Sequence, residues 1–141
     1  MADYLFVYGT LRRCWASPLG AAVEARCRYV GEGYLQGLLY DALKGYPGAV
    51  ESLGADDKVH GELLEILGDG GDLLALLDEY EECADHFPHP HEYIRKRLSV
   101  TLCAGSTVQA WVYLYNHDLA GLKPIVSGDF VAYLREADGA E

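Results

Sequence analysis

The chain has 141 residues, which is typical of one domain with a substantial core and too short for two ordinary domains, so we expect a single domain over residues 1–141. Half of the residues are hydrophobic, no tract is of low complexity, and no apolar stretch approaches the roughly 20 residues that span a bilayer, which predicts a globular protein without a membrane partner. The formal net charge of −11 repels polyanions, so we expect no nucleic-acid partner.

The four cysteines are widely scattered and show neither a CxxC pair nor a zinc-ligand spacing. The N-terminus does not combine a basic segment, an apolar run and a small-residue cleavage site. We therefore expect a cytoplasmic protein with free thiols, present as a monomer or weak homodimer.

The first half of the chain is predicted to be mostly β. A helix of about three turns is expected at 18–26, with Ser17 as its N-cap and Pro18 at its first position. The strand before it is apolar enough to be buried on both faces. Gly and Pro turns separate the later strands, and the predicted strands are Tyr4–Tyr8, Tyr34–Asp41, Ala49–Ser52 and Val59–Ile66.

The second half adds two helices and a hairpin. Asp69 or Asp72 can cap a helix that runs to about Cys83, before a loop broken by Pro88 and Pro90. The remaining predicted elements are strands Tyr93–Leu102 and Val108–Tyr115, a hairpin turn at Ala104–Ser106, and a helix from Ser127 to Ala137 capped by Ser127 or Asp129.

The order of the predicted helices and strands indicates the fold class. Strands follow one another without alternating with helices, which disfavours a doubly wound parallel sheet. Several successive strands in so small a chain predict an α+β protein, in which a curled sheet or small β-barrel carries peripheral helices.

The helix from Asp72 to Cys83 carries the most informative acidic residue. At about 100° per residue its apolar stripe comprises Leu73, Leu74, Leu76, Leu77 and Tyr80. Glu81 projects onto that stripe, whereas Glu79 and Glu82 point away and Asp78 lies at its edge, so these three are expected on a solvated face. A carboxylate among leucines loses hydration, which raises its pKa toward neutrality, so Glu81 is a candidate general acid/base.

Four short motifs, in this order, suggest a family. They are Tyr8-Gly9-Thr10-Leu11, the segment Gly37–Asp41 followed by Tyr46-Pro47-Gly48, the segment Leu77–Glu81, and Ser127-Gly128-Asp129-Phe130. Together the motifs resemble the γ-glutamyl cyclotransferase-like family, with its AIG2-like and γ-glutamylamine cyclotransferase branches. The resemblance implies a compact mixed β-barrel surrounded by helices.

The resemblance also implies an activity, because the glutamate that ends the Leu-Asp-x-x-Glu pattern is catalytic in the family and corresponds to Glu81 here. The implied enzyme releases 5-oxoproline and an amine from a small γ-glutamyl compound and needs neither a metal nor an organic cofactor. Such a reaction requires a base, because an α-amine is largely protonated at pH 7.

Six residues are predicted to bind the substrate. A Gly-Thr turn after a strand can present consecutive main-chain N–H groups to a carboxylate, so Gly9, Thr10 and Leu11 are candidates, with Tyr8 shaping the cavity wall. Tyr93 and Tyr115 either orient the substrate through their hydroxyls or pack in the core; Tyr113 is an alternative to Tyr115 on the strand expected to line the barrel. Arg95 or Arg97 either neutralises a substrate carboxylate or lies on a solvent-facing strand surface.

The sequence also fits other interpretations. Residues 12–16 depart from the basic residue, glycine and asparagine that many relatives carry there, which leaves substrate choice undecided. The alternative function is a non-catalytic small-anion-binding module of the same fold. His86, His89 and His91 invite a metal site, although the prolines between them favour an exposed loop. Cys83 lacks the partners that a nucleophilic thiol requires.

Overall fold

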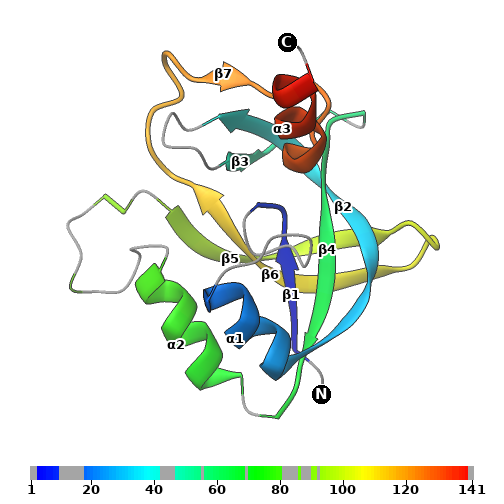
Figure 1. The fold of residues 1–141 in the computed structure, drawn as a ribbon, viewed down its shortest axis with the longest axis vertical. Helices are drawn as coiled ribbons and strands as arrows, with labels where there is room; N and C mark the ends of the chain where they lie inside the picture. The colour runs from blue at the N-terminus through cyan, green and yellow to red at the C-terminus, as the bar shows by residue number, and fades with distance from the viewer. Residues whose placement is uncertain are drawn as a thin grey trace.

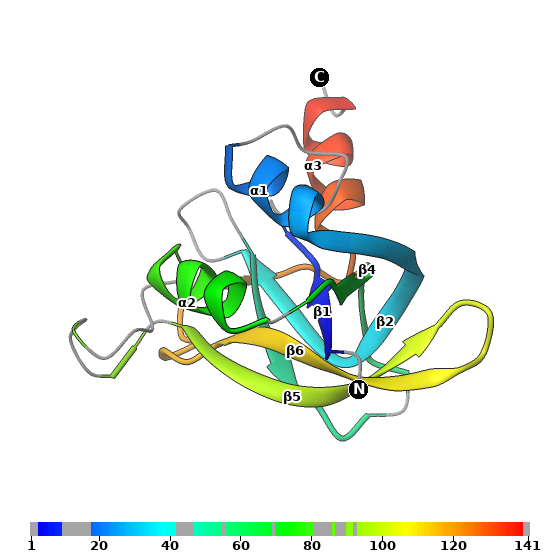
Figure 2. The same ribbon diagram turned by 90° about the horizontal axis from the view of Figure 1, so that it is seen from below.

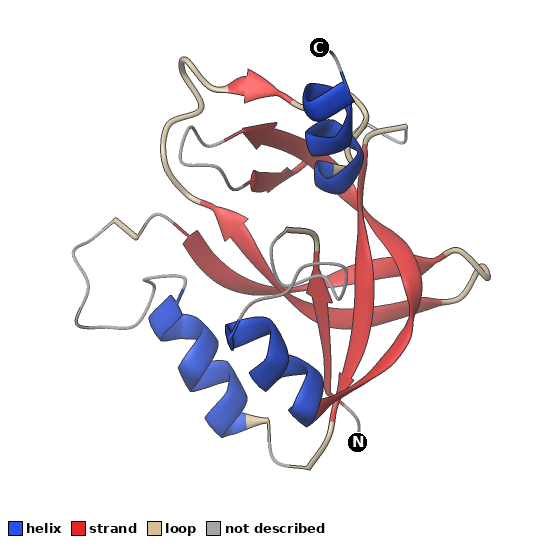
Figure 3. Ribbon diagram, in the orientation of Figure 1, coloured by secondary structure: helices blue, strands red, loops and turns tan. Residues whose placement is uncertain are grey.

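A computed structural model describes residues 3–9, 18–41, 47–54, 56–68, 70–80, 86, 90–91 and 93–139. It contains three short helices and seven strands (Figures 1 and 3). In chain order these are β1 (Asp3–Val7), α1 (Pro18–Arg26), β2 (Cys27–Asp41), β3 (Pro47–Glu51), β4 (Lys58–Ile66), α2 (Gly71–Tyr80), β5 (Tyr93–Leu102), β6 (Thr107–Tyr115), β7 (Lys123–Pro124) and α3 (Phe130–Gly139).

Five of the strands close into a barrel. The sheet runs in the order β3-β2-β4-β1-β6-β5, and β5 returns to pair with β2, which closes the circle β2-β4-β1-β6-β5. The pair β1–β6 is parallel and the other pairs are antiparallel, so the barrel is mixed. The predicted α+β fold, a small mixed β-barrel with peripheral helices, is confirmed.

The barrel wall separates two apolar clusters. The interior cluster takes alternate residues of every barrel strand and includes Phe6, Leu35, Leu63 and Val112. The second cluster lies outside the wall, where Val23 of α1 and the leucines of α2 pack against β1, β4 and β6. Both helices lie at one end of the molecule, whereas α3 lies beside the far end of β2 (Figure 1). Seen from below, α1 and α2 are the nearer helices and α3 is the more distant one (Figure 2).

The α3 end of the barrel is fastened by a short turn. Asp129 is the N-cap of α3, because its carboxylate accepts a hydrogen bond of 3.2 Å from the main-chain N–H of Ala132. Gly128 has a φ of +70° and its carbonyl accepts a hydrogen bond of 2.7 Å from the N–H of His60 in β4. The hydroxyl of Tyr133 donates to Asp41 at 3.0 Å, which joins α3 to the end of β2.

The largest difference from the predicted elements is in β2. The strand begins directly after α1 at Cys27, so the sequence prediction, which began at Tyr34, missed its first seven residues. Gly31 and Gly33 weakened the sequence signal for the first half of this strand, because glycine is depleted in strands. Gly33 has a specific role: a Cβ there would lie 2.6 Å from the carbonyl oxygen of Thr101, where β5 closes the barrel against β2.

The helix α1 agrees with its predicted bounds at 18–26, and β5 with its predicted bounds at 93–102. The other predicted strands end within two residues of the observed ones. The last helix begins three residues later than predicted, at Phe130, because Ser127 and Asp129 form the turn that caps it. The two-residue strand β7 was not predicted, since a strand that short has no periodicity to read.

Two of the four cysteines lie among the described residues, and both are free thiols. Cys103 is exposed, whereas burial raises the pKa of the Cys27 thiol to about 11. Cys27 is therefore protonated at neutral pH and is a poor nucleophile. None of the helices in the described ranges has the length and apolarity that a bilayer-spanning segment requires.

Candidate functional site

The end of β1 is fastened to two other strands through Tyr8. Its hydroxyl donates a hydrogen bond to the main-chain carbonyl of Tyr113 in β6 and accepts one of 3.3 Å from the N–H of Ala49 in β3. Its ring belongs to the interior cluster of the barrel. Tyr8 thus fixes the point at which β1 ends and the following turn begins.

Gly9 follows at a position where little more than a hydrogen atom fits. A Cβ at Gly9 would lie 2.9 Å from Cγ and 3.0 Å from Cδ of Pro47, which is closer than Cβ atoms approach in proteins. The main chain at Gly9 therefore runs directly against the ring of the first residue of β3. This close approach is a physical reason for a glycine at the turn.

The same short segment of β3 receives the two other aromatic candidates. The hydroxyl of Tyr93 donates to the carbonyl of Pro47 at 2.7 Å. Tyr115, directly opposite Tyr93 in the β5–β6 pair, packs on Gly48, where an added Cβ would lie 2.8 Å from its ring. The two rings meet edge to face with their centroids 5.5 Å apart.

Four residues predicted to bind the substrate thus converge on Pro47–Ala49: Tyr8, Gly9, Tyr93 and Tyr115. The sequence placed Pro47 and Gly48 in a motif but assigned them no role. The hydroxyls of Tyr8 and Tyr93 both donate to main-chain carbonyls, so one function of each is to hold together this junction of the four strands β1, β3, β5 and β6. Three further predicted site residues, Thr10, Leu11 and Glu81, lie outside the described residues.

The helix that precedes Glu81 in the sequence packs as an amphipathic helix. Leu73, Leu74 and Leu77 are buried against the sheet. Leu76 was also predicted on the apolar stripe, but the structure corrects this, since the residue is 39% exposed. The buried direction of α2 is therefore shifted away from Leu76 and toward Leu74.

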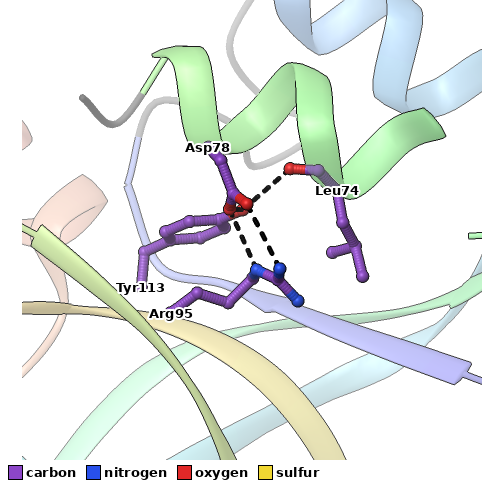
Figure 4. Close-up of polar contacts among 4 residues, drawn as sticks. All are labelled: Leu74, Asp78, Arg95 and Tyr113. Carbon is purple, nitrogen blue, oxygen red and sulfur yellow. Dashed lines mark hydrogen bonds and ion pairs between the residues drawn. The ribbon is translucent and has the colours of Figure 1, made fainter. Parts of the chain in front are cut away.

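Among the acidic residues of α2, Asp78 differs from its expected solvated position. It was expected on a solvated face, but its side chain is only 21% exposed and forms an ion pair with Arg95 of β5 (Figure 4). The two side chains meet through two hydrogen bonds, from Nε to Oδ1 at 2.9 Å and from Nη2 to Oδ2 at 3.2 Å. The hydroxyl of Tyr113 adds a third, to Oδ1 at 2.6 Å.

Arg95 and Tyr113 also occupy places that differ from those predicted. Arg95 is 27% exposed and lies over the ring of Trp111, with its guanidinium carbon 4.7 Å from the ring centroid. Tyr113 belongs to the cluster between the sheet and the helices and does not line the barrel. Tyr113 and Arg95 are directly opposite each other in the β5–β6 pair, so Asp78 of α2 reaches two neighbouring side chains of one face.

The sequence signal for this ion pair was weak. Asp78 and Arg95 are 17 positions apart, and their contact forms only because α2 lies on the outer face of β5 and β6. The available hint was the position of Asp78 at the edge of the apolar stripe, four residues after the buried Leu74.

The histidine-rich segment was the candidate for a metal site. His86 forms an ion pair of 3.2 Å with Glu79, and both side chains are more than half exposed. Within the part of the chain that the structure describes, no group of three or more His, Cys, Asp or Glu side chains is arranged to hold a metal ion. His89 lies outside that part.

Comparisons with known proteins agree on one family. A family model described as "Gamma-glutamyl cyclotransferase, AIG2-like" matches residues 5–132. The Escherichia coli protein ytfP is 30% identical, with a TM-score of 0.63, over 92% of this chain and 97% of its own. A mouse AIG2-like protein is 24% identical, with a TM-score of 0.61, over 85% and 90%.

A third solved structure, YkqA from Bacillus subtilis, is 22% identical with a TM-score of 0.71; the match covers the whole of this chain and 44% of that protein. The mouse and Bacillus proteins, both below 25% identity, show a shared fold. No curated protein matches the sequence.

Proposed function

We propose, because the chain belongs to the γ-glutamyl cyclotransferase, AIG2-like family, that it releases 5-oxoproline and an amine from a small γ-glutamyl compound. The observation that supports this most is the span of the family match, which includes the Tyr8–Gly9 turn, Pro47–Ala49 and Glu81. In the proposal Glu81 is the general acid/base and no cofactor takes part.

The proposed reaction is an intramolecular aminolysis. The α-amino nitrogen of the γ-glutamyl group attacks its own γ-carbonyl carbon, a new C–N bond closes the five-membered lactam, and the C–N bond to the leaving amine breaks. The α-ammonium loses two protons as it becomes the lactam N–H, and both end on the departing nitrogen, which leaves as an ammonium ion, so atoms and charge balance. Glu81 would accept a proton from the α-nitrogen and pass it to the departing nitrogen, while a folded substrate conformation supplies much of the rate through orientation.

The packing of α2 supports Glu81 as the base. In a helix, position 81 points between positions 74 and 77, and Leu74 and Leu77 are both buried against the sheet. The exposed Leu76 lies on the other side of that direction. The side of α2 that carries its buried contacts is therefore the side on which the sequence places Glu81.

The binding turn supports recognition of the substrate carboxylate. A net charge of −11 does not attract an anion, so local dipoles must hold one. The proposal assigns this to main-chain N–H groups of Gly9, Thr10 and Leu11. The contact of Gly9 with Pro47 supports it, because a turn held in one position loses less entropy on binding. The free thiols Cys27 and Cys103 favour the cytosol as the compartment.

A substrate panel tests the proposal. The purified chain is incubated with γ-glutamyl-ε-lysine, other γ-glutamyl amines and γ-glutamyl dipeptides, and 5-oxoproline and the free amine are measured by mass spectrometry. The α-glutamyl isomers are matched controls, because their cyclisation cannot expel the amine. We expect equal amounts of both products from at least one γ-glutamyl compound, and the same rate in the presence of EDTA.

Other outcomes would favour the rival functions. Binding of γ-glutamyl compounds without product would indicate the non-catalytic anion-binding module. Activity that is lost in EDTA and restored by zinc would replace the proposal with a metal-dependent mechanism.

Gly9→Ala tests the turn. The added methyl group meets the Pro47 ring at 2.9 Å, so the turn or β3 must shift, and we expect kcat/KM to fall by about 10-fold or more. Gly31→Ala is the control, since its Cβ would meet nothing closer than Leu102 at 3.7 Å. Unchanged kcat/KM in Gly9→Ala would remove this turn from the binding site.

A further inference from the structure

The contacts of Asp78 join the end of α2 to the sheet that carries the binding turn (Figure 4). We propose that Asp78 is a positioning residue: together with Arg95 and Tyr113 it holds the last turn of α2, directly before Glu81 in the sequence, in a fixed relation to Tyr8. The inference rests on the proposed function, because that function gives Glu81 and the Tyr8–Gly9 turn their roles.

Three hydrogen bonds hold the Asp78 carboxylate. Oδ1 accepts hydrogen bonds from Nε of Arg95 at 2.9 Å and from the hydroxyl of Tyr113 at 2.6 Å, and Oδ2 accepts one from Nη2 of Arg95 at 3.2 Å. Three charge-assisted bonds to two residues of a rigid β-ribbon fix both the position and the orientation of the carboxylate. Asp78 is two residues before the end of α2, so the contacts act on its last turn.

Tyr113 contacts both α2 and Tyr8, the residue that follows β1. Its hydroxyl donates to Asp78 in α2, and its main-chain carbonyl accepts the hydrogen bond of the Tyr8 hydroxyl from β1. One residue of β6 therefore contacts the helix before Glu81 and the strand before Gly9. These two elements are far apart in sequence, and Tyr113 contacts both of them.

The last turn of α2 needs contacts from outside the helix. A helix of ten residues is marginal by itself, and its last turn lacks the intrahelical partners that hold the middle. Among the described side chains of that turn, Leu77 supplies the apolar contact and Asp78 the polar one, whereas Glu79 is exposed. Without the contacts of Asp78, the described side chains of that turn would contact the sheet through Leu77.

Arg95 is itself held in place by Trp111. Its guanidinium lies over the ring of Trp111 on the same face of the ribbon, which restricts the side chain before it meets Asp78. A lysine at this position would keep the charge but lose the two-pronged geometry and the stacking. The arrangement thus depends on the shape of arginine as well as on its charge.

Tyr113→Phe and Asp78→Asn test the inference. The first removes only the phenolic oxygen and leaves the carbonyl that binds Tyr8; the second keeps the shape of the side chain and removes its charge. We expect each to lower kcat by about 10-fold, with KM changed by less than about 3-fold, because the reacting group is displaced while the substrate still binds. We also expect amide hydrogen exchange in residues 74–80 to become about 10-fold faster.

Tyr133→Phe is the matched control. It removes one phenol-to-carboxylate hydrogen bond of similar kind, to Asp41, but acts on α3 at the other end of the molecule. It should leave kcat and the exchange of residues 74–80 unchanged. The double variant Asp78→Asn/Tyr113→Phe should lose less than the product of the single effects, because both single variants disturb the same Tyr113–Asp78 hydrogen bond.

The outcomes separate this inference from the proposed function. If the wild-type chain turns over no compound of the panel, the proposed function fails, and hydrogen exchange in Tyr113→Phe still decides whether the contact orders α2. Unchanged exchange and unchanged kcat in both variants would overturn the inference. A lower kcat with unchanged exchange would also overturn it, because Asp78 would then act other than by holding the helix.

Discussion

Glu81→Gln is expected to lower kcat for release of 5-oxoproline by about 100-fold or more. Glutamine keeps the size of the side chain and its hydrogen-bonding capacity but cannot accept the proton of the substrate α-ammonium. The fold and substrate binding should persist, because the change adds no volume and no charge. Steady-state kinetics with the best compound of the panel measures the effect, and circular dichroism checks the fold.

Glu82→Gln is the control for that experiment. The helical direction of position 82 points away from the stripe that contains Leu73 and Leu77, so we expect its activity to stay within about 2-fold of the wild type. Activity of Glu81→Gln close to that of the wild type would contradict the proposed mechanism. Equal losses in both variants would indicate a general effect of acidic charge near the end of α2.

Gly128→Ala is expected to lower the free energy of unfolding by about 3 kcal/mol or more, the largest effect on stability that we expect from a single methyl group. At a φ of +70° an alanine is strained, and its Cβ would overlap the carbonyl oxygen of Lys58. Relief of that overlap requires the turn to move away from β4, which breaks the hydrogen bond from His60 to Gly128. Urea unfolding followed by tryptophan fluorescence measures the change.

Gly68→Ala separates the two causes of this effect. Gly68 has nearly the same φ as Gly128, +67°, but a Cβ there would meet nothing within 4 Å. Its loss of stability should therefore reflect the strained backbone alone and stay smaller than that of Gly128→Ala. Equal losses in the two variants would show that the contact between Gly128 and Lys58 contributes nothing.

Several elements were predictable from local signals in the sequence. The helix α1 and the strand β5 have their predicted bounds, and the hairpin between β5 and β6 turns at Gly105 as expected. Ser17 and Pro18 indicated the start of α1, and the turn residues 104–106 between two long strand patterns indicated the hairpin. The first half of β2 was missed because glycine is depleted in strands, whereas Gly33 is required where β5 closes the barrel against β2.

The partners of the candidate site were not predictable by the same means. The sequence pattern and family resemblance identified Tyr8, Gly9, Tyr93 and Tyr115 singly, but their meeting at Pro47–Ala49 depends on contacts over 41 and 46 positions. Asp78 was misjudged for a related reason. A helical wheel shows which way a side chain points, but not that an arginine and a tyrosine from another element lie there.

The parallel pair of β1 and β6 has a consequence for the order in which the protein folds. The hydrogen bond of the Tyr8 hydroxyl to Tyr113 joins residues 105 positions apart, and Leu5 lies opposite Trp111. The ribosome therefore synthesises β1 first and β6, its second neighbour in the sheet, among the last strands. The barrel closes only when most of the chain has emerged. Until then β1 keeps an unpaired edge open to other chains, and closure of the barrel and assembly of the Tyr8 junction are one late event.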